Sequence, residues 1–189
     1  MDLHRIAERI GLIERLRRRR LRIMNDALQG ALSPEGLRGR RILEIGCGNG
    51  RDFLRYVAAH RSGELHGVDR SPWTAPVPHV SFCVADARAL PFPYGYFDLA
   101  VSIGLVDELH STEERHEAIR EMLRVARSYC IVSGLHRGHD GLSTETPLDW
   151  SQLPELAGSV QRRFHYVPGI VANLVVASTP RGSRRRRAH

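Results

Sequence analysis

One stretch decides the fold of this chain: Arg41-Ile42-Leu43-Glu44-Ile45-Gly46-Cys47-Gly48-Asn49-Gly50. Its first half is a short apolar run, which is typical of a strand buried on both faces of a parallel sheet. The glycines of its second half allow the backbone to turn sharply and to approach a ligand closely. Residues 51–58 then have the apolar spacing of a helix. The pattern predicts a strand, a glycine loop and a helix whose N-terminus faces that loop, which is the arrangement of a nucleotide-type site.

The spacing of the glycines restricts the class of nucleotide. A dinucleotide-binding loop needs a third glycine three residues after the second, and this chain has Arg51 there. A P-loop needs a lysine, but all 28 basic residues are arginine, which also excludes Schiff-base lysine catalysis. The pattern Glu44-x-Gly46-x-Gly48-x-Gly50 instead resembles motif I of the class I S-adenosylmethionine-dependent methyltransferases. The cofactor that this resemblance implies is S-adenosyl-L-methionine.

Two acids follow near the ends of predicted strands. Residues 64–69 are predicted to form a second strand, and Asp69 lies 19 residues beyond Gly50, where an acid can accept hydrogen bonds from both ribose hydroxyls. Residues 80–84 are predicted to form a third strand, and in the family an aspartate just beyond it, here Asp86, reaches the amino group of adenine. Together with the glycine loop, the resemblance predicts these cofactor-binding residues: Glu44, Gly46, Cys47, Gly48, Gly50, Asp69, Arg70, Asp86, Ala87 and Ser102.

A second specific likeness does not depend on the glycines. Residues 90–102, Leu-Pro-Phe-Pro-Tyr-Gly-Tyr-Phe-Asp-Leu-Ala-Val-Ser, closely resemble the Leu-Pro-Phe-x-x-x-x-Phe-Asp segment of the ubiquinone- and menaquinone-biosynthesis type of methyltransferase. The second half of this segment is predicted to be a fourth strand, with Ser102 at the cofactor edge. The glycine loop, Asp69, Asp86 and the pair Phe97-Asp98 are then expected at one edge of one sheet, where open α/β sheets bind their ligands.

The predicted fold class is α/β, with a Rossmann-like, doubly wound, mostly parallel sheet, a C-terminal antiparallel hairpin and an N-terminal helical extension. Residues 111–114 have the pattern of a capping box that opens a helix, and residues 129–133 are predicted to form the fifth strand. Residues 160–166 and 170–178 are predicted to form the hairpin. The predicted division is an N-terminal helical extension or lid (1–40), a methyltransferase domain (41–180) and a disordered arginine-rich tail (181–189).

The connection between the second and third predicted strands departs from the usual pattern. Residues 70–79 are too few and too rich in proline for a normal crossover helix. We expect an irregular link that carries Trp73 and leaves one face of the sheet less covered than usual. An uncovered face would suit a second copy of the chain, so a homodimer is one expectation.

The segment after the fourth strand holds the candidate catalytic residues. Many relatives carry a histidine pair there, whereas this chain has Asp107-Glu108, with His110 just beyond. Displacement of a methyl group from sulfonium onto oxygen, nitrogen or carbon depends mainly on positioning, and a hydroxyl acceptor would also need a base. The candidates for that base are His110, Asp107 and Glu108, and a structural role for each of them stays open. His136 and His139 lie in a polar loop and are alternatives for substrate contact, and we predict no metal site there.

The net charge of +7 is concentrated at the two ends of the chain. Residues 1–41 carry 11 arginines against 5 acids, and residues 181–189 carry 5 arginines and no acid, whereas the segment between them is net negative. Because no separate RNA-binding domain is visible, we favour a small-molecule acceptor, which would be anionic if Arg17 or Arg20 faces inward. Methylation of RNA or protein through the arginine-rich ends is the alternative, and a cofactor-binding scaffold without catalysis is a third interpretation.

Cysteine usage and hydropathy bear on the compartment. The three cysteines are odd in number and form no C-x-x-C pair, as expected for reduced thiols in the cytosol. No apolar run reaches the length of a transmembrane helix. We therefore expect a cytoplasmic protein without a membrane partner.

Deletion of residues 181–189 tests whether the arginine-rich tail binds substrate. We predict unchanged turnover, because a small acceptor does not need the tail. If RNA is the substrate, the tail arginines contact phosphates, and each contact adds a slope of roughly 0.7–0.9 to the log–log plot of affinity against salt. RNA binding measured over a range of salt concentrations separates the two cases. Tight, salt-sensitive RNA binding that disappears with the tail would contradict the small-molecule interpretation.

Overall fold

The computed structural model of the chain describes residues 15, 22, 34–50, 53–59, 63–73, 77–137, 159–167 and 170–178. The predicted N-terminal helices with Arg17 and Arg20, His139 in the polar loop and the tail lie outside these ranges. The proposed domain boundaries therefore stay predictions. Within the described ranges, no helix combines the length and apolarity needed to cross a membrane.

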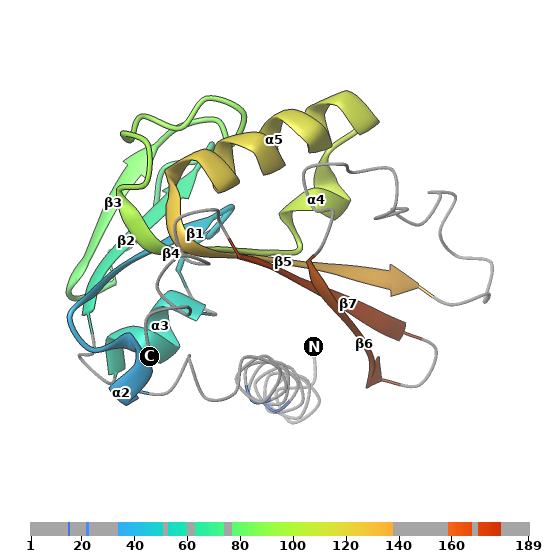
Figure 1. Ribbon diagram of the computed structural model, residues 1–189, viewed down its shortest axis with the longest axis horizontal. Coiled ribbons are helices and arrows are strands. Elements are labelled where there is room, and N and C mark those ends of the chain that lie inside the picture. Colours follow the sequence, from blue (N-terminus) through green and yellow to red (C-terminus); the bar gives the residue numbers. More distant parts are fainter. Residues whose placement is uncertain are drawn as a thin grey trace, which may run out of the picture.

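The described strands form one sheet in the order β3-β2-β1-β4-β5-β7-β6 (Figure 1). The first five strands pair in parallel, whereas β7 is antiparallel to both β5 and β6. This confirms the predicted Rossmann-like parallel sheet, and the strand order reverses at β1, between β2 and β4. The strands are β1 (Arg40–Ile45), β2 (Gly63–Asp69), β3 (Val80–Val84), β4 (Phe97–Ile103), β5 (Ala126–Arg137), β6 (Val160–Val167) and β7 (Ile170–Ser178).

Most element bounds agree with the sequence, but the fifth strand and one helix do not. The strand β5 extends beyond the predicted 129–133 at both ends. Ala126 pairs with Phe97 of β4, and β7 pairs with β5 from Tyr129↔Ser178 to Arg137↔Ile170. A short helix directly after β4 was not predicted. The helices are α2 (Pro34–Leu37), α3 (Phe53–Ala59), α4 (Leu105–Glu108) and α5 (Thr112–Val125). The expectation that Phe97-Asp98 lies at the ligand edge was wrong, because this pair begins β4 at the opposite edge, where Asp98 accepts a hydrogen bond from the N–H of Arg41 at 3.0 Å.

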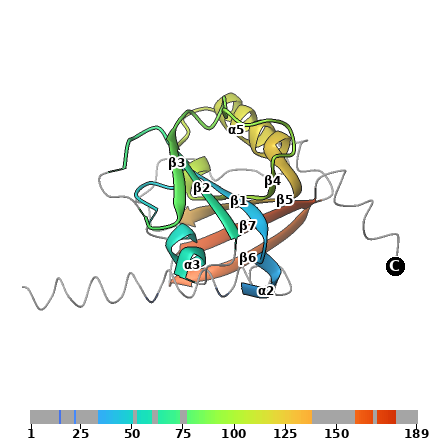
Figure 2. The same ribbon diagram turned by 90° about the vertical axis from the view of Figure 1, so that its left-hand side faces the viewer.

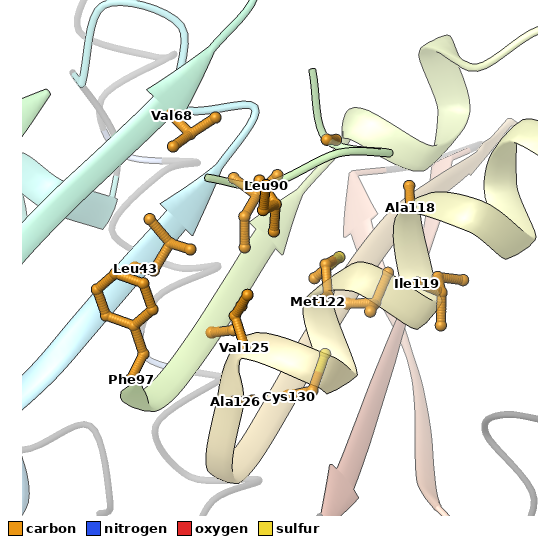
Figure 3. Packing of buried hydrophobic residues seen from close by; sticks show 14 of the residues in the cluster. Leu43, Val68, Leu90, Phe97, Ala118, Ile119, Met122, Val125, Ala126 and Cys130 are labelled. Carbon is orange, nitrogen blue, oxygen red and sulfur yellow. The ribbon is translucent and has the colours of Figure 1, made fainter. Parts of the chain in front are cut away.

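The sheet carries a hydrophobic cluster on each face. The helix α5 lies on one face and α3 on the other (Figures 1 and 2), and side chains alternate between the two faces along each strand. The cluster that includes Phe53 and Leu54 of α3 is called the α3 cluster, and the one that includes the buried residues of α5 is called the α5 cluster. In β4, Leu99 and Val101 belong to the α3 cluster, whereas Ala100 belongs to the α5 cluster. Four apolar residues of α5 are fully buried in the α5 cluster (Figure 3): Ala118, Ile119, Met122 and Val125.

The link between β2 and β3 contains no helix in its described residues, 70–73 and 77–79. The indole of Trp73 stacks on Phe82 with ring centroids 4.5 Å apart and packs against the α3 cluster. A Cβ atom added to Gly67 would lie 3.2 Å from Trp73, so the indole lies close against the strand β2. Aromatic packing therefore covers part of the face on which a crossover helix would normally lie.

Two charged side chains of α5 hold the segment that precedes β4. The carboxylate of Glu121 accepts a hydrogen bond from the backbone N–H of Leu90 at 2.8 Å. The guanidinium of Arg124 donates to the carbonyl oxygens of Leu90 and Phe92 at 2.9 and 2.7 Å, and it also pairs with Glu121. Arg124 holds the pKa of Glu121 below its usual value, although burial opposes this. This network fixes the Leu-Pro-Phe segment on α5.

The ion pair predicts a pH-dependent loss of stability. Because the pKa of Glu121 is lower in the folded chain than in the unfolded chain, its contribution is present above the ordinary glutamate pKa and is lost as pH falls. We expect Glu121→Gln to lower the free energy of unfolding by about 1–2 kcal/mol at pH 7 and by less below about pH 4. Urea denaturation at the two pH values measures both differences.

A matched control is Glu113→Gln on the same helix. The carboxylate of Glu113 is exposed and lies 3.7 Å from Arg120, so its loss should hardly change stability. If Glu121→Gln lowers the free energy of unfolding equally at both pH values, the ion pair is not the source of the lost stability.

Candidate functional site

The glycine loop after β1 is held in a conformation that favours glycine. Gly46, Gly48 and Gly50 have φ values of +69°, +50° and +63°, in the left-handed region that other residues rarely adopt. The N–H groups of Gly46 and Cys47 both donate to the carbonyl oxygen of Val68, at 2.9 and 3.1 Å. The loop is therefore fixed against the end of β2.

Gly46 and Gly48 have different surroundings. A Cβ atom on Gly46 would lie 2.8 Å from the Cβ atom of Leu105, so this glycine lets α4 pack against the loop. A Cβ atom on Gly48 would meet nothing within 4 Å, and this glycine lines a cavity. Gly48 therefore leaves backbone open to a ligand, as the sequence predicted for this loop.

Asp69, the last residue of β2, connects the loop to the next segment. Its Oδ2 accepts a hydrogen bond from the N–H of Gly48 at 2.8 Å, and its Oδ1 accepts one from Ser71 at 3.0 Å. Each carboxylate oxygen can accept two hydrogen bonds, so each keeps capacity for a ligand hydroxyl. Asp69 both orders the site and remains able to bind.

A cavity of about 320 Å³ lies at the carboxyl ends of β1 to β4, in the size range of small-molecule sites. Leu105, Glu108 and Leu109 in and beside α4 form one of its walls. Seven of the predicted site residues line it: Gly46, Gly48, Asp69, Arg70, Asp86, Ala87 and Glu108.

The ionisable groups of the cavity select the kind of ligand. Asp69, Asp86 and Glu108 contribute carboxylates, and Arg70 contributes a guanidinium. Arg88 pairs with Asp86 from outside the lining residues, so carboxylates still outnumber guanidinium groups. Such a site suits a ligand with hydroxyl, amino and cationic groups and disfavours a phosphate. S-adenosyl-L-methionine has ribose hydroxyls, two amino groups and a sulfonium, and these residues fit it.

Asp86 is held by Arg88 through three hydrogen bonds. Its Oδ1 accepts from the backbone N–H and from Nε of Arg88 at 2.9 and 3.0 Å, and its Oδ2 accepts from Nη2 at 2.8 Å. The same arginine donates to Glu114 at 2.7 Å. These bonds lower the pKa of Asp86, so the carboxylate is charged when it faces the cavity.

Several predicted cofactor residues do not line the cavity. Glu44 is buried and accepts a hydrogen bond from the N–H of Leu54 at 3.1 Å, so it holds the beginning of α3. Gly50 faces Trp73, because an added Cβ would lie 2.8 Å from the indole. Ser102 is fully buried, and its hydroxyl has no hydrogen-bond partner within the described part of the chain. Their predicted contacts with the cofactor stay predictions.

Cys47 also lies off the cavity wall, within the α3 cluster. Burial, with a smaller contribution from the Glu44 carboxylate, raises the pKa of this thiol to about 12. The thiol is therefore protonated at neutral pH and is not a nucleophile.

The three catalytic candidates lie in different places. Glu108 lines the cavity. Asp107 lies against β5, because a Cβ atom on Gly134 would be 2.8 Å from its Oδ1. His110 is exposed, and its backbone N–H donates to Glu114 Oε2 at 2.9 Å. Of the three, only Glu108 reaches the cavity, and the role of a base stays a prediction for all of them.

Two groups at the site were not found in the sequence. Leu105 and Leu109 line the cavity because α4 presents them, and this helix is too short to show a periodic pattern. Arg88 and Glu114 meet across 26 residues of sequence, and neither spacing nor composition signals such a contact. Within the described residues, no group of three or more histidines, cysteines and acids is arranged to hold a metal ion.

Comparison with known proteins gives the family. Residues 42–128 match the sequence profile of the family described as "Methyltransferase domain". Ajmaline N-methyltransferase of Rauvolfia serpentina is 31% identical over 161 residues, which cover 76% of this chain and 54% of that protein. The ubiquinone/menaquinone biosynthesis C-methyltransferase of Pseudomonas paraeruginosa is 34% identical over 130 residues, which cover 56% and 48% of the two chains. The chain thus spans about half the length of these curated relatives.

Solved structures agree on the fold. A SAM-dependent methyltransferase from Aquifex aeolicus superposes with a TM-score of 0.55 at 16% identity, over 78% of this chain and 88% of that one. These sequence matches show that residues 42–128 form a domain of the class I S-adenosylmethionine-dependent methyltransferases, whose cofactor is S-adenosyl-L-methionine. This confirms the family that the glycine loop and the Leu-Pro-Phe segment indicated.

The contact between Gly46 and Leu105 can be tested with two glycine variants. Gly39 and Gly46 have nearly equal φ values, +67° and +69°, but an added Cβ has room only at Gly39. We expect Gly39→Ala to cost about 1–2 kcal/mol of stability for the left-handed backbone alone. Gly46→Ala should cost about 1–3 kcal/mol more, because α4 must move. Urea denaturation of both variants gives the difference, and equal losses would rule out the proposed packing of α4 on the loop.

Proposed function

We propose that this chain binds S-adenosyl-L-methionine in the cavity at the carboxyl edge of the sheet and transfers the methyl group to a small-molecule nucleophile by direct displacement. The observation that carries the proposal is the juxtaposition of the open Gly48 backbone with the Asp69 and Asp86 carboxylates around one cavity. The acceptor atom is oxygen, nitrogen or carbon.

Each part of the cofactor has a proposed partner. Asp69 accepts hydrogen bonds from the ribose hydroxyls, and Asp86, with Ala87 beside it, binds the adenine end. The methionine part lies along Gly46 and Gly48, where the backbone can be approached closely. The support is the position of these residues on the cavity wall.

The methyl transfer itself needs little covalent chemistry from the protein. The cofactor supplies an electrophilic methyl group on its sulfonium sulfur, and the protein holds the acceptor in line with that bond. Glu108 lies on the cavity wall, where its carboxylate can orient a donor group or take a proton from a hydroxyl acceptor. Asp107 and His110 do not line the cavity, so they are weaker candidates for this base than Glu108.

The names of the relatives support a small acceptor. The two reported above are named for N-methylation of ajmaline and for C-methylation in ubiquinone and menaquinone biosynthesis. The alternative, RNA methylation, has support from the arginine-rich ends and from a tRNA methyltransferase of Xenopus tropicalis, 30% identical over 98 residues. That match covers only 14% of the tRNA enzyme, so it supports the shared cofactor domain and not a shared substrate. A screen of metabolite pools and total RNA with methyl-labelled cofactor would identify the acceptor.

The cofactor site is tested by calorimetry with S-adenosylhomocysteine. Asp69→Ala should weaken binding by about tenfold or more, because the ribose contact and the Gly48 anchor are both lost. Glu64→Gln is the matched control, since this acid lies in the same strand but pairs with His66 away from the cavity. Equal affinities of Asp69→Ala and the wild type would refute the site, and binding of NAD in place of S-adenosylhomocysteine would refute the cofactor.

A further inference from the structure

Arg88 uses most of the hydrogen-bonding capacity of Asp86. A carboxylate has about four acceptor positions, and the backbone N–H, Nε and Nη2 of Arg88 take three of them. Both positions on Oδ1 are filled, and Oδ2 keeps one. Because Asp86 lines the cavity, it can offer a ligand a single acceptor in a fixed orientation.

The same guanidinium is connected through Glu114 to a second wall of the cavity. Its Nη1 donates to Glu114 Oε1 at 2.7 Å. The other oxygen of Glu114 accepts hydrogen bonds from the backbone N–H groups of His110 and Ser111, at 2.9 and 3.3 Å. These two residues directly follow Glu108 and Leu109, which line the cavity. Arg88 therefore connects the wall beyond β3 with the wall formed by α4.

We propose that Arg88 is a positioning residue that fixes Asp86 as a single hydrogen-bond acceptor for the exocyclic amino group of the cofactor's adenine. The proposal rests on the proposed cofactor site. An amino group has a free N–H to donate, which matches the remaining position on Oδ2. A ring with a carbonyl at that place has only an acceptor, which would meet the carboxylate unfavourably.

The alternative is an ordinary surface ion pair, and the chain contains one for comparison. Arg120 and Glu113 are 3.7 Å apart, with half or more of each side chain exposed. Arg88, by contrast, makes two short contacts to separate acids, and about a third of its side chain is exposed. An exposed ion pair contributes little to stability and does not fix its side chains, whereas an arginine that binds both oxygens of a carboxylate fixes the orientation of that carboxylate.

The experiment compares two ligands by calorimetry: S-adenosylhomocysteine and S-inosylhomocysteine, in which the amino group is replaced by a carbonyl oxygen. The wild type should prefer the adenosyl ligand by about tenfold or more. Arg88→Met keeps an unbranched, flexible side chain but removes its donors. We expect it to weaken binding of S-adenosylhomocysteine by about tenfold and to leave binding of S-inosylhomocysteine within about twofold.

Two further variants separate geometry from charge and from general structure. Arg88→Lys keeps the charge but cannot bind both oxygens of Asp86, so it should behave like Arg88→Met. Arg120→Met, which removes the exposed pair with Glu113 on α5, should bind both ligands like the wild type. Melting temperatures of all variants show whether each one is folded.

Three results would overturn this proposal alone, and a fourth would overturn the proposed function as well. Equal weakening of both ligands in Arg88→Met would indicate a general structural role, and full rescue by lysine would indicate charge alone. Unchanged binding in Arg88→Met would remove any role of Arg88, while the wild type would still show the cofactor site. Failure of the wild type to bind either ligand would instead remove the proposed function, and this inference with it.

Discussion

The site depends on one carboxylate. Asp69 lies where β2 ends, and it accepts a hydrogen bond from the N–H of Gly48 in the loop after β1 and another from Ser71 in the link to β3. The loop after β1 and the link after β2 are therefore both held by the same carboxylate. The loop can remain open at Gly48 because it is held elsewhere, by Asp69 and by the carbonyl oxygen of Val68. Hydrogen bonds within the protein thus hold the loop and the link at the carboxyl edge of the sheet before a ligand binds.

Short sequence patterns predicted those elements of the fold that depend on neighbouring residues in the chain. The capping box at Ser111 is present, with its hydroxyl accepting from the N–H of Glu114 and that glutamate accepting from the N–H of Ser111, and the third strand has the predicted bounds of 80–84. Features set by distant partners were missed. The length of β5 depends on β7, and the short helix α4 is held by packing on Gly46 and β5. Tertiary contacts of this kind leave no period in the sequence.

In the candidate site, too, the sequence predicted which residues lie near the strand ends but not the contacts that distant residues make. Spacing from the glycine loop was enough to predict Asp69 at the site, and the family resemblance was needed to predict Asp86; both line the cavity, because strand ends of a parallel sheet share one edge. Spacing does not say which way a side chain points. Glu44 holds the beginning of α3 and Ser102 lies in the interior, so neither lines the cavity, and their contacts with the cofactor stay predictions. The link between Arg88 and Glu114 joins two predicted regions that no motif connects.

A crystal structure of the chain with S-adenosylhomocysteine tests the central claim most directly, namely that the cavity ordered by Asp69 is the cofactor site. The account predicts ribose hydroxyls within hydrogen-bond distance of Asp69, the adenine amino group donating to Asp86, and the homocysteine part along Gly46 and Gly48. A ligand bound elsewhere, or one in this cavity with its ribose away from Asp69, would contradict it.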